Sequence, residues 1–277
     1  LRQPHIDFFS APPYVPGGEM WPLPWASVRA YKKLWIADAS GLLPDQLFQA
    51  RAPGAACVIL PADQPRWRDL EERIRQAGEP ELCVALDEVS AAYMTWGEAL
   101  SKPVIVDQFA EAAKGMNAEP CLAETLLGRR LRCERVLFLN LFWVDDCRQR
   151  TVRELLDRAK QVAFIYAAGG LGPGRGLSGK AMKQCTGIAV TTLRAKAAPL
   201  VLRVGKRQYG FEQAVRPWVA AVDTSCDVLG YLAGTRLPGL VVKRVGQCRV
   251  LWSAAAPVPA EILRQFFGCR GEQQGQN

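Results

Sequence analysis

Nine cysteines and a single histidine limit the chemistry that this chain can perform. No two cysteines form a CxxC pair; they are Cys57, Cys83, Cys121, Cys133, Cys147, Cys185, Cys226, Cys248 and Cys269. Because His5 alone cannot complete a site of zinc-ligand spacing, we expect no bound metal. Unpaired cysteines in a chain of 277 residues also favour a reducing compartment such as the cytoplasm over a disulfide-rich secreted location.

Nucleophilic catalysis by cysteine needs a histidine that takes the thiol proton. The apolar run Gln161–Gly170 ends in a sharp turn, YAAGG from Tyr166 onward, which holds neither cysteine nor serine. Cys185 follows only after the next helix, and His5 belongs to another region of the chain. The residue inventory therefore excludes a cysteine–histidine triad in this part of the protein.

Carboxylates leave a second possibility, since glycoside hydrolysis by retention uses two of them about 5–5.5 Å apart. Asp38 follows the strand candidate Lys33–Ala37 and could supply one such carboxylate if that strand belongs to a barrel. A loop or capping aspartate explains Asp38 as well. Tyr14 and Trp35 could stack on sugar rings, or they could pack inside a barrel.

Two further groups of residues could bind ligands. Asp87 and Ser90 follow an apolar strand candidate, at the end where open α/β sheets present ligands, although helix capping also explains them. The glycine-rich turn Gly169–Gly179 lacks the spacing of a P-loop or a dinucleotide fingerprint. We therefore expect that turn to be a surface loop and expect no cofactor.

The elements that would position these residues are clearest in the middle of the chain. The apolar run Val136–Val144 predicts a strand, and Asp145 and Asp146 are suited to cap a following helix. That helix carries apolar residues at helical spacing and leads directly into the run from Gln161. Two strands joined by a helix predict a right-handed, parallel βαβ unit and hence an α/β domain.

Charge and hydropathy exclude some partners. Residues 1–81 carry nine Lys or Arg against ten Asp or Glu, whereas the remainder carries twenty-six against seventeen. The densest basic cluster, Arg129–Arg135, has no interleaved aromatics and no recognition motif, so we expect a solvated face and not a nucleic-acid site. No apolar window reaches transmembrane length, so we expect no membrane span.

The first eighty residues repeat strand, loop and helix as a (β/α)₈ barrel does, in too few units to close one. Here Ser10, a proline and Tyr14 form one motif, and Ser27 with Lys33–Trp35 forms another. Both resemble the late barrel region of β-galactosidase-like glycoside hydrolases. The resemblance places Asp38 where the family carries its catalytic glutamate, and it implies that Tyr14 and Trp35 contact substrate.

The rest of the chain resembles the trimerisation domain of family forty-two β-galactosidases, which has a class I glutamine-amidotransferase-like fold. The match runs through a strand and helix at Glu81–Met94, a helix ending in Thr-Gly-Ile at Ser178–Ile188, an alternating hairpin at Leu240–Trp252 and a closing helix at Pro259–Phe267. We therefore expect a flavodoxin-like parallel sheet preceded by a partial (β/α)₈ barrel. The expected divisions are residues 1–80, 81–272 and a disordered tail, 273–277.

The resemblance implies a C-terminal fragment of a glycoside hydrolase that acts on carbohydrate. Its second domain would be non-catalytic and would support a homo-oligomer, a trimer in the family, while helping to wall the sugar site. Because half the barrel is absent, we expect this chain alone to be inactive. The alternative is a non-catalytic carbohydrate-binding or scaffolding protein derived from a degenerate glycosidase.

Overall fold

A computed structural model describes residues 80–93, 100–114, 116–128, 133–174, 176–194 and 196–268, together with five short strands earlier in the chain. Those strands are β1 (Phe8–Ala11), β2 (Tyr14–Val15), β3 (Glu19–Met20), β4 (Leu34–Asp38) and β5 (Cys57–Ile59). Strands β1, β4 and β5 pair in parallel in their sequence order, as successive βα units do. A barrel that includes them stays a prediction. The helices expected within residues 1–80 and the tail 273–277 lie outside the described residues.

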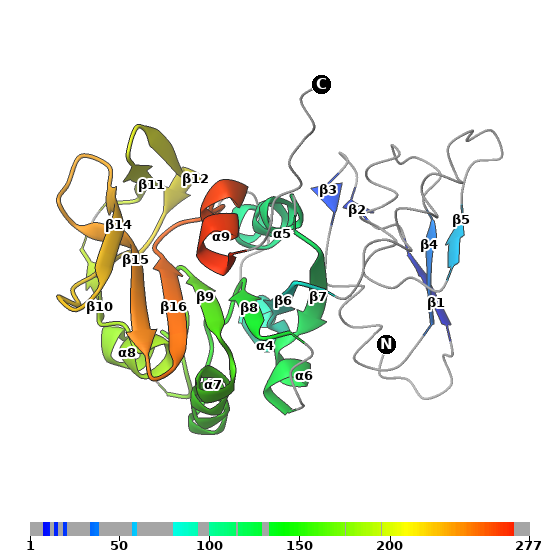
Figure 1. The fold of residues 1–277 in the computed structure, drawn as a ribbon. Helices are drawn as coiled ribbons and strands as arrows, with labels where there is room; N and C mark the ends of the chain where they lie inside the picture. The colour runs from blue at the N-terminus through cyan, green and yellow to red at the C-terminus, as the bar shows by residue number, and fades with distance from the viewer. Residues whose placement is uncertain are drawn as a thin grey trace.

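A nine-stranded mixed sheet forms the centre of the second region (Figure 1). Its parallel half has the order β7-β6-β8-β9-β16, and β15, β14, β11 and β12 continue it in antiparallel fashion. The bounds are β6 Leu82–Leu86, β7 Ala118–Leu122, β8 Arg135–Phe138, β9 Gln161–Ile165, β11 Ala198–Val204, β12 Arg207–Val215, β14 Asp227–Leu232, β15 Pro238–Val245 and β16 Cys248–Ser253. The predicted flavodoxin-like parallel order is therefore confirmed, and the predicted hairpin is β15–β16.

Helices cover both faces of this sheet (Figure 1). Helices α5 and α9 pack together on one side, whereas α6, α7 and α8 follow one another on the other side. The helices are α4 Glu88–Tyr93, the π-helix η1 Lys102–Asp107, α5 Gln108–Ala113, α6 Ala123–Gly128, α7 Asp146–Arg158, α8 Gly179–Thr186 and α9 Ala260–Phe267. A separate two-stranded ladder joins β10 (Val190–Leu193) to β13 (Trp218–Ala221). Among the described residues, no helix has the length and apolar character to cross a bilayer.

The predicted βαβ unit is β8-α7-β9, and its two strands pair in parallel. Asp145 caps α7 as expected, because its carboxylate accepts a hydrogen bond from the backbone N–H of Arg148 at 2.8 Å. The helix buries Val152, Leu155 and Leu156 against the sheet. The strand expected over Val136–Val144 ends earlier, at Phe138, and the remaining residues form an irregular segment that crosses the carboxyl edge of the sheet.

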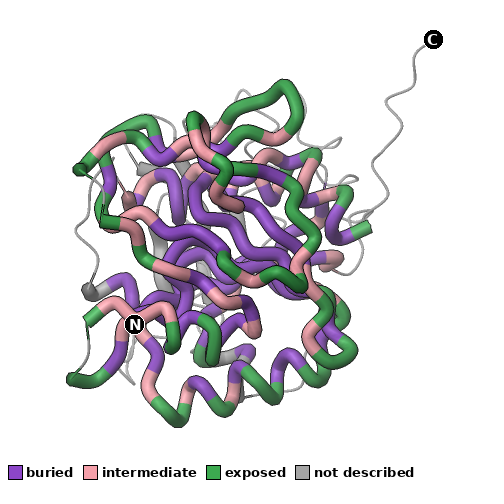
Figure 2. Tube along the Cα trace, turned by 90° about the vertical axis from the view of Figure 1, so that its left-hand side faces the viewer, coloured by how far each residue is buried: buried purple, intermediate pink, exposed green. Residues whose placement is uncertain are grey.

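The core lies between the sheet and its helices, where the tube in Figure 2 is continuously buried along the central strands. Trp252 on β16 is the largest fully buried side chain. Phe138 and Phe164, on neighbouring strands, stack with ring centroids 5.3 Å apart. Strands β6, β8 and β9 are buried along almost their whole length, which agrees with the continuous apolar runs that predicted β8 and β9.

The Thr-Gly-Ile motif at the end of α8 is a helix cap. Gly187 adopts a left-handed conformation with φ of 78°, and its N–H donates to the carbonyl of Lys183. The Thr186 hydroxyl donates to the carbonyl of Met182 at 2.9 Å and accepts from the N–H of Ile188 at 3.1 Å. The motif that suggested the family resemblance therefore has a structural role here.

Replacing Gly187 with alanine should lower the free energy of unfolding by roughly 2 kcal/mol or more, combining left-handed strain with overpacking. A Cβ atom there would lie 2.6 Å from Cγ2 of Val245. Gly205→Ala is the matched control, because Gly205 has φ of 59° and a Cβ added to it would meet no neighbour within 4 Å. Urea denaturation should show the larger loss at Gly187; equal losses would contradict the packing argument.

Candidate functional site

The strand order creates one place where this sheet would ordinarily bind a ligand. The chain leaves β6 for β7 on one side and returns to β8 on the other. In open α/β sheets, ligands bind outside the carboxyl ends of the two strands at such a switch point. Asp87 directly follows β6, and Asn140 follows β8.

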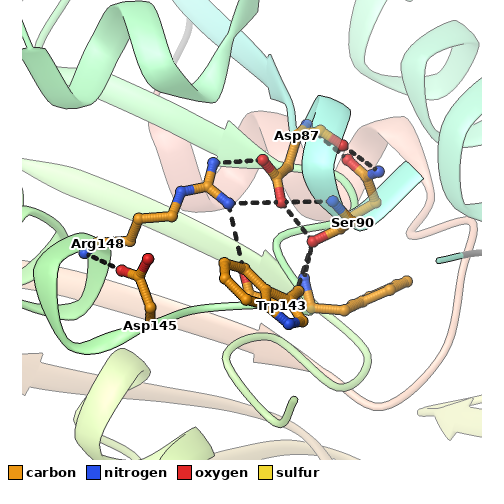
Figure 3. Close-up of polar contacts among 7 residues, drawn as sticks. Asp87, Ser90, Trp143, Asp145 and Arg148 are labelled. Atoms are coloured by element: carbon orange, nitrogen blue, oxygen red, sulfur yellow. Dashed lines mark hydrogen bonds and ion pairs between the residues drawn. The ribbon is translucent and has the colours of Figure 1, made fainter. Parts of the chain in front are cut away.

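The carboxylate of Asp87 is fully engaged at this position (Figure 3). The guanidinium of Arg148 donates to both of its oxygens, one of them at 3.1 Å. The backbone N–H of Ser90 donates to Oδ2 of Asp87 at 3.0 Å, and the Ser90 hydroxyl donates to the same oxygen. Asp87 therefore caps helix α4, which was one of the two roles predicted for it.

Asn140 and Ser90 form the remaining hydrogen bonds at the switch point, outside the ends of β6 and β8. The side-chain amide of Asn140 accepts from the N–H of Asp87 at 2.8 Å and donates to its carbonyl at 3.0 Å. The Ser90 hydroxyl oxygen accepts from the N–H groups of Phe142 and Trp143 at 2.9 and 2.8 Å. The irregular segment after β8 is thereby fastened to the end of β6.

This network leaves little for a ligand to use. Asp87 and Ser90 are 1% exposed and Asn140 is fully buried. The guanidinium of Arg148 also donates to the carbonyl of Trp143 at 3.2 Å. Because the polar groups at the switch point bond to one another, the protein itself fills the place that a ligand occupies in other α/β sheets.

The sharp turn after β9 is the position at which a nucleophilic cysteine or serine was sought in the sequence. Tyr166 occupies this position. Tyr166 has φ of 55°, and among the described residues it alone combines a side chain with a positive φ. Its N–H donates to the carbonyl of Ser253 at 2.7 Å, and its own carbonyl accepts from Nε1 of Trp252 at 2.9 Å. The sharp turn predicted at this point is thus present and is held by β16.

The Tyr166 side chain points into the interior of the protein. Its hydroxyl donates to the carbonyl of Pro217, and its ring meets Phe142 and Phe211 edge to face at 5.9 and 5.4 Å. Burial raises the pKa of the Tyr166 phenol well above its usual range, so the group stays neutral. Tyr166 therefore has a packing and hydrogen-bonding role at this turn.

The buried cysteines also have structural surroundings. Cys185 is 1% exposed and lies against Gly169, where an added Cβ would meet its Sγ at 2.7 Å. The Cys133 thiol donates to the carbonyl of Glu81 at 2.8 Å, and the interaction of the Cys83 thiol with the Cys121 thiol, together with burial, raises the pKa of Cys83. The raised pKa values of the Cys83 and Cys133 thiols make these two groups weak nucleophiles. Within the described ranges, no group of three or more metal-ligating side chains has the geometry to hold an ion.

The residues predicted to contact sugar lie in the early strands. Asp38 is the last residue of β4, pairs with Ile59 in register and so stands at the carboxyl end of a parallel strand. Trp35 lies in the same strand and Tyr14 in β2. Their side chains lie outside the described part of the chain, so their sugar contacts stay predictions.

Arg148 and Asn140 are residues at the switch point that sequence reasoning missed, and Arg148 was the harder of the two to find. It stands 61 positions from Asp87, so no local spacing joins the two. The sequence feature that could have identified Arg148 was its position in the first turn of the helix after β8. That turn faces the same sheet edge as the end of β6.

Comparison with known proteins relates the chain to glycosidases through its fold. No protein-family model and no curated protein sequence matches it. A β-galactosidase from the haloarchaeon Halorubrum lacusprofundi superposes with a TM-score of 0.62 at 12% identity, covering 91% of this chain and 47% of its own. A catalytic mutant of Gan42B, a GH42 β-galactosidase from G. stearothermophilus, gives 0.60 at 12% identity, covering 95% and 48%.

A third neighbour is the exo-β-1,4-mannosidase Op5Man5 from Opitutaceae bacterium strain TAV5, with a TM-score of 0.53 at 14% identity, covering 84% of this chain and 50% of its own. The chain thus spans about half the length of each of these three proteins. At such identities the likeness concerns the fold. It confirms the resemblance to β-galactosidase-like proteins at that level and agrees with a C-terminal part of such a protein.

Proposed function

We propose that this chain is the C-terminal portion of a β-galactosidase-like glycoside hydrolase, and that its α/β region is architectural. The observation that carries the proposal is the closed switch point, in which Asp87, Ser90, Asn140 and Arg148 satisfy one another. The nucleophile turn is likewise filled by Tyr166. A domain in which these two positions are filled can still serve packing, oligomerisation and the walling of a neighbouring sugar site.

The catalytic chemistry then belongs to the barrel. On this proposal Asp38, at the carboxyl end of β4, is the late carboxylate, and its acid/base partner projects from an earlier barrel strand. An aspartate side chain is one methylene shorter than the glutamate of the family. Misplacement of a catalytic group by about 1 Å can lower the rate by a factor of about 10². We therefore expect the longer enzyme that contains this chain to have a low catalytic rate.

Self-association is expected to use the sheet around β14. Four of the five large hydrophobic side chains exposed in the described part of the chain fall within ten residues: Val222, Val228, Leu229 and Tyr231, at 37–53% exposure. Exposed apolar side chains gathered on one element indicate interaction sites in soluble proteins. We call the three that lie on β14, which are Val228, Leu229 and Tyr231, the β14 patch, and we place on it the contact with a second copy of this chain.

Sedimentation velocity should therefore show oligomers at micromolar concentration, and Leu229→Ser with Tyr231→Ser should shift them to monomer. Losing two apolar anchors of an interface typically costs at least tenfold in affinity. Val89→Ser is the matched control, since Val89 on α4 is 39% exposed and lies outside the β14 patch. Monodisperse monomer in the unsubstituted protein would remove oligomerisation from the proposal.

A non-catalytic carbohydrate-binding protein is the second candidate, favoured by the aspartate at position 38 in place of the family glutamate. The two candidates differ in the longer protein that contains this chain. Turnover of a galactoside that is lost in Asp38→Ala supports the enzyme. Saturable galactose binding without turnover, seen by calorimetry, supports the binding protein.

A further inference from the structure

A basic pocket lies away from the switch point, between the end of β10 and the start of β13. Its volume is about 530 Å³, within the ~300–1,000 Å³ typical of small-molecule sites. Six residues line it, three of them cationic: Thr192, Leu193, Arg194, Lys196, Arg216 and Pro217. The lining thus carries positive charge and no carboxylate.

The walls of this pocket are fixed to the core. In the β10–β13 ladder Leu193 pairs with Trp218 and Thr192 with Val219. The indole N–H of Trp218 donates to the carbonyl of Ala198 at 3.2 Å, and the Tyr166 hydroxyl donates to the carbonyl of Pro217. These contacts fix the residues on either side of the cations, which lowers the entropic cost of binding.

Within the described part of the chain, the three cations have no acidic partner. Six ion pairs join described residues, and none includes Arg194, Lys196 or Arg216. All three residues are exposed. Three like charges around one concavity repel one another and raise the local concentration of anions.

We propose that this pocket binds the acidic substituent of a sugar, a carboxylate or a sulfate ester. Arginine forks recognise such planar or tetrahedral oxyanions through paired hydrogen bonds, and Lys196 adds a point charge. The hydroxyl of Thr192 supplies a neutral donor for a sugar oxygen. The preference for an anion rests on the pocket alone, whereas the choice of a sugar as its carrier rests on the proposed function.

The test compares the full chain with two variants that carry the same change in net charge. The pocket variant combines Arg194→Gln, Lys196→Gln and Arg216→Gln. The control variant combines Lys180→Gln, Lys206→Gln and Arg236→Gln, three exposed cations that lie outside the pocket lining. Calorimetry at low salt measures binding of five ligands: inorganic sulfate, a galacturonate disaccharide, a sulfated galactose disaccharide, neutral galactobiose and a single-stranded oligonucleotide.

The proposal expects saturable binding of an acidic disaccharide that weakens at least tenfold in the pocket variant and less than twofold in the control variant. Neutral galactobiose should bind at least tenfold more weakly than the acidic sugars. Equal losses in both variants, or no saturable binding of any anion, would overturn the anion site. If sulfate binds in the pocket but no acidic sugar binds more tightly than sulfate, the sugar assignment is wrong. Tighter binding of a single-stranded oligonucleotide than of every acidic sugar would likewise contradict it.

Discussion

Replacing Arg148 with methionine is expected to lower the free energy of unfolding by about 3–5 kcal/mol, the usual cost of breaking a buried ion pair from one side. The Asp87 side chain is only 2% exposed, so its charge would lose the cation that neutralises it without gaining water. The loss should appear as a lower midpoint in urea denaturation followed by circular dichroism, with an unchanged slope.

Two variants make this result specific. Arg150→Met removes an exposed arginine from the same helix and should change stability by less than about 0.5 kcal/mol. Arg148→Met combined with Asp87→Asn should recover much of the loss, because the neutral amide still accepts from Ser90 but no longer buries a charge. If Arg148→Met and Arg150→Met behave alike, the switch-point network does not stabilise the fold.

Replacing Trp252 with alanine is expected to cost about 3–5 kcal/mol, the range for removing a buried aromatic ring. Trp252 is fully buried on β16, between β9 and β15, and its indole N–H holds the carbonyl of Tyr166 at 2.9 Å. The same variant should loosen the turn at Tyr166, seen as faster hydrogen exchange of the amides that follow β9.

Trp252→Phe separates packing from hydrogen bonding. It keeps most of the ring volume and leaves the Tyr166 carbonyl without its partner, so a smaller loss of about 1–3 kcal/mol is expected. A loss from Trp252→Ala no larger than that from Trp252→Phe would mean that the site collapses around the missing ring.

The elements that sequence reasoning predicted well are those fixed by local chemistry. Asp145 was predicted to cap a helix and caps α7, because its carboxylate meets an amide three residues ahead in its own chain segment. The βαβ unit followed from two apolar runs on either side of an amphipathic helix. The end of β8 was mispredicted, since Leu139–Val144 is as apolar as a strand but is buried by crossing the sheet edge, where Trp143 bridges to Leu171.

The location of the candidate site could be predicted from the sequence, but the contacts between its residues could not. The sequence located Asp87 and Ser90 at a ligand-binding edge and left capping open, and the structure shows the capping bond. It could not pair Asp87 with Arg148, because that contact depends on the strand order. Likewise, Arg194 and Arg216 line one pocket only because β10 pairs with β13. No sequence motif indicated this pocket.

The most direct measurement of the central claim is hydrolysis of nitrophenyl β-galactoside by this 277-residue chain and by its Asp38→Ala variant. If the chain contributes architecture and the complete catalytic pair requires the rest of a barrel, both proteins should release nitrophenol at the buffer rate. Robust turnover by the unsubstituted chain that disappears in Asp38→Ala would contradict the account.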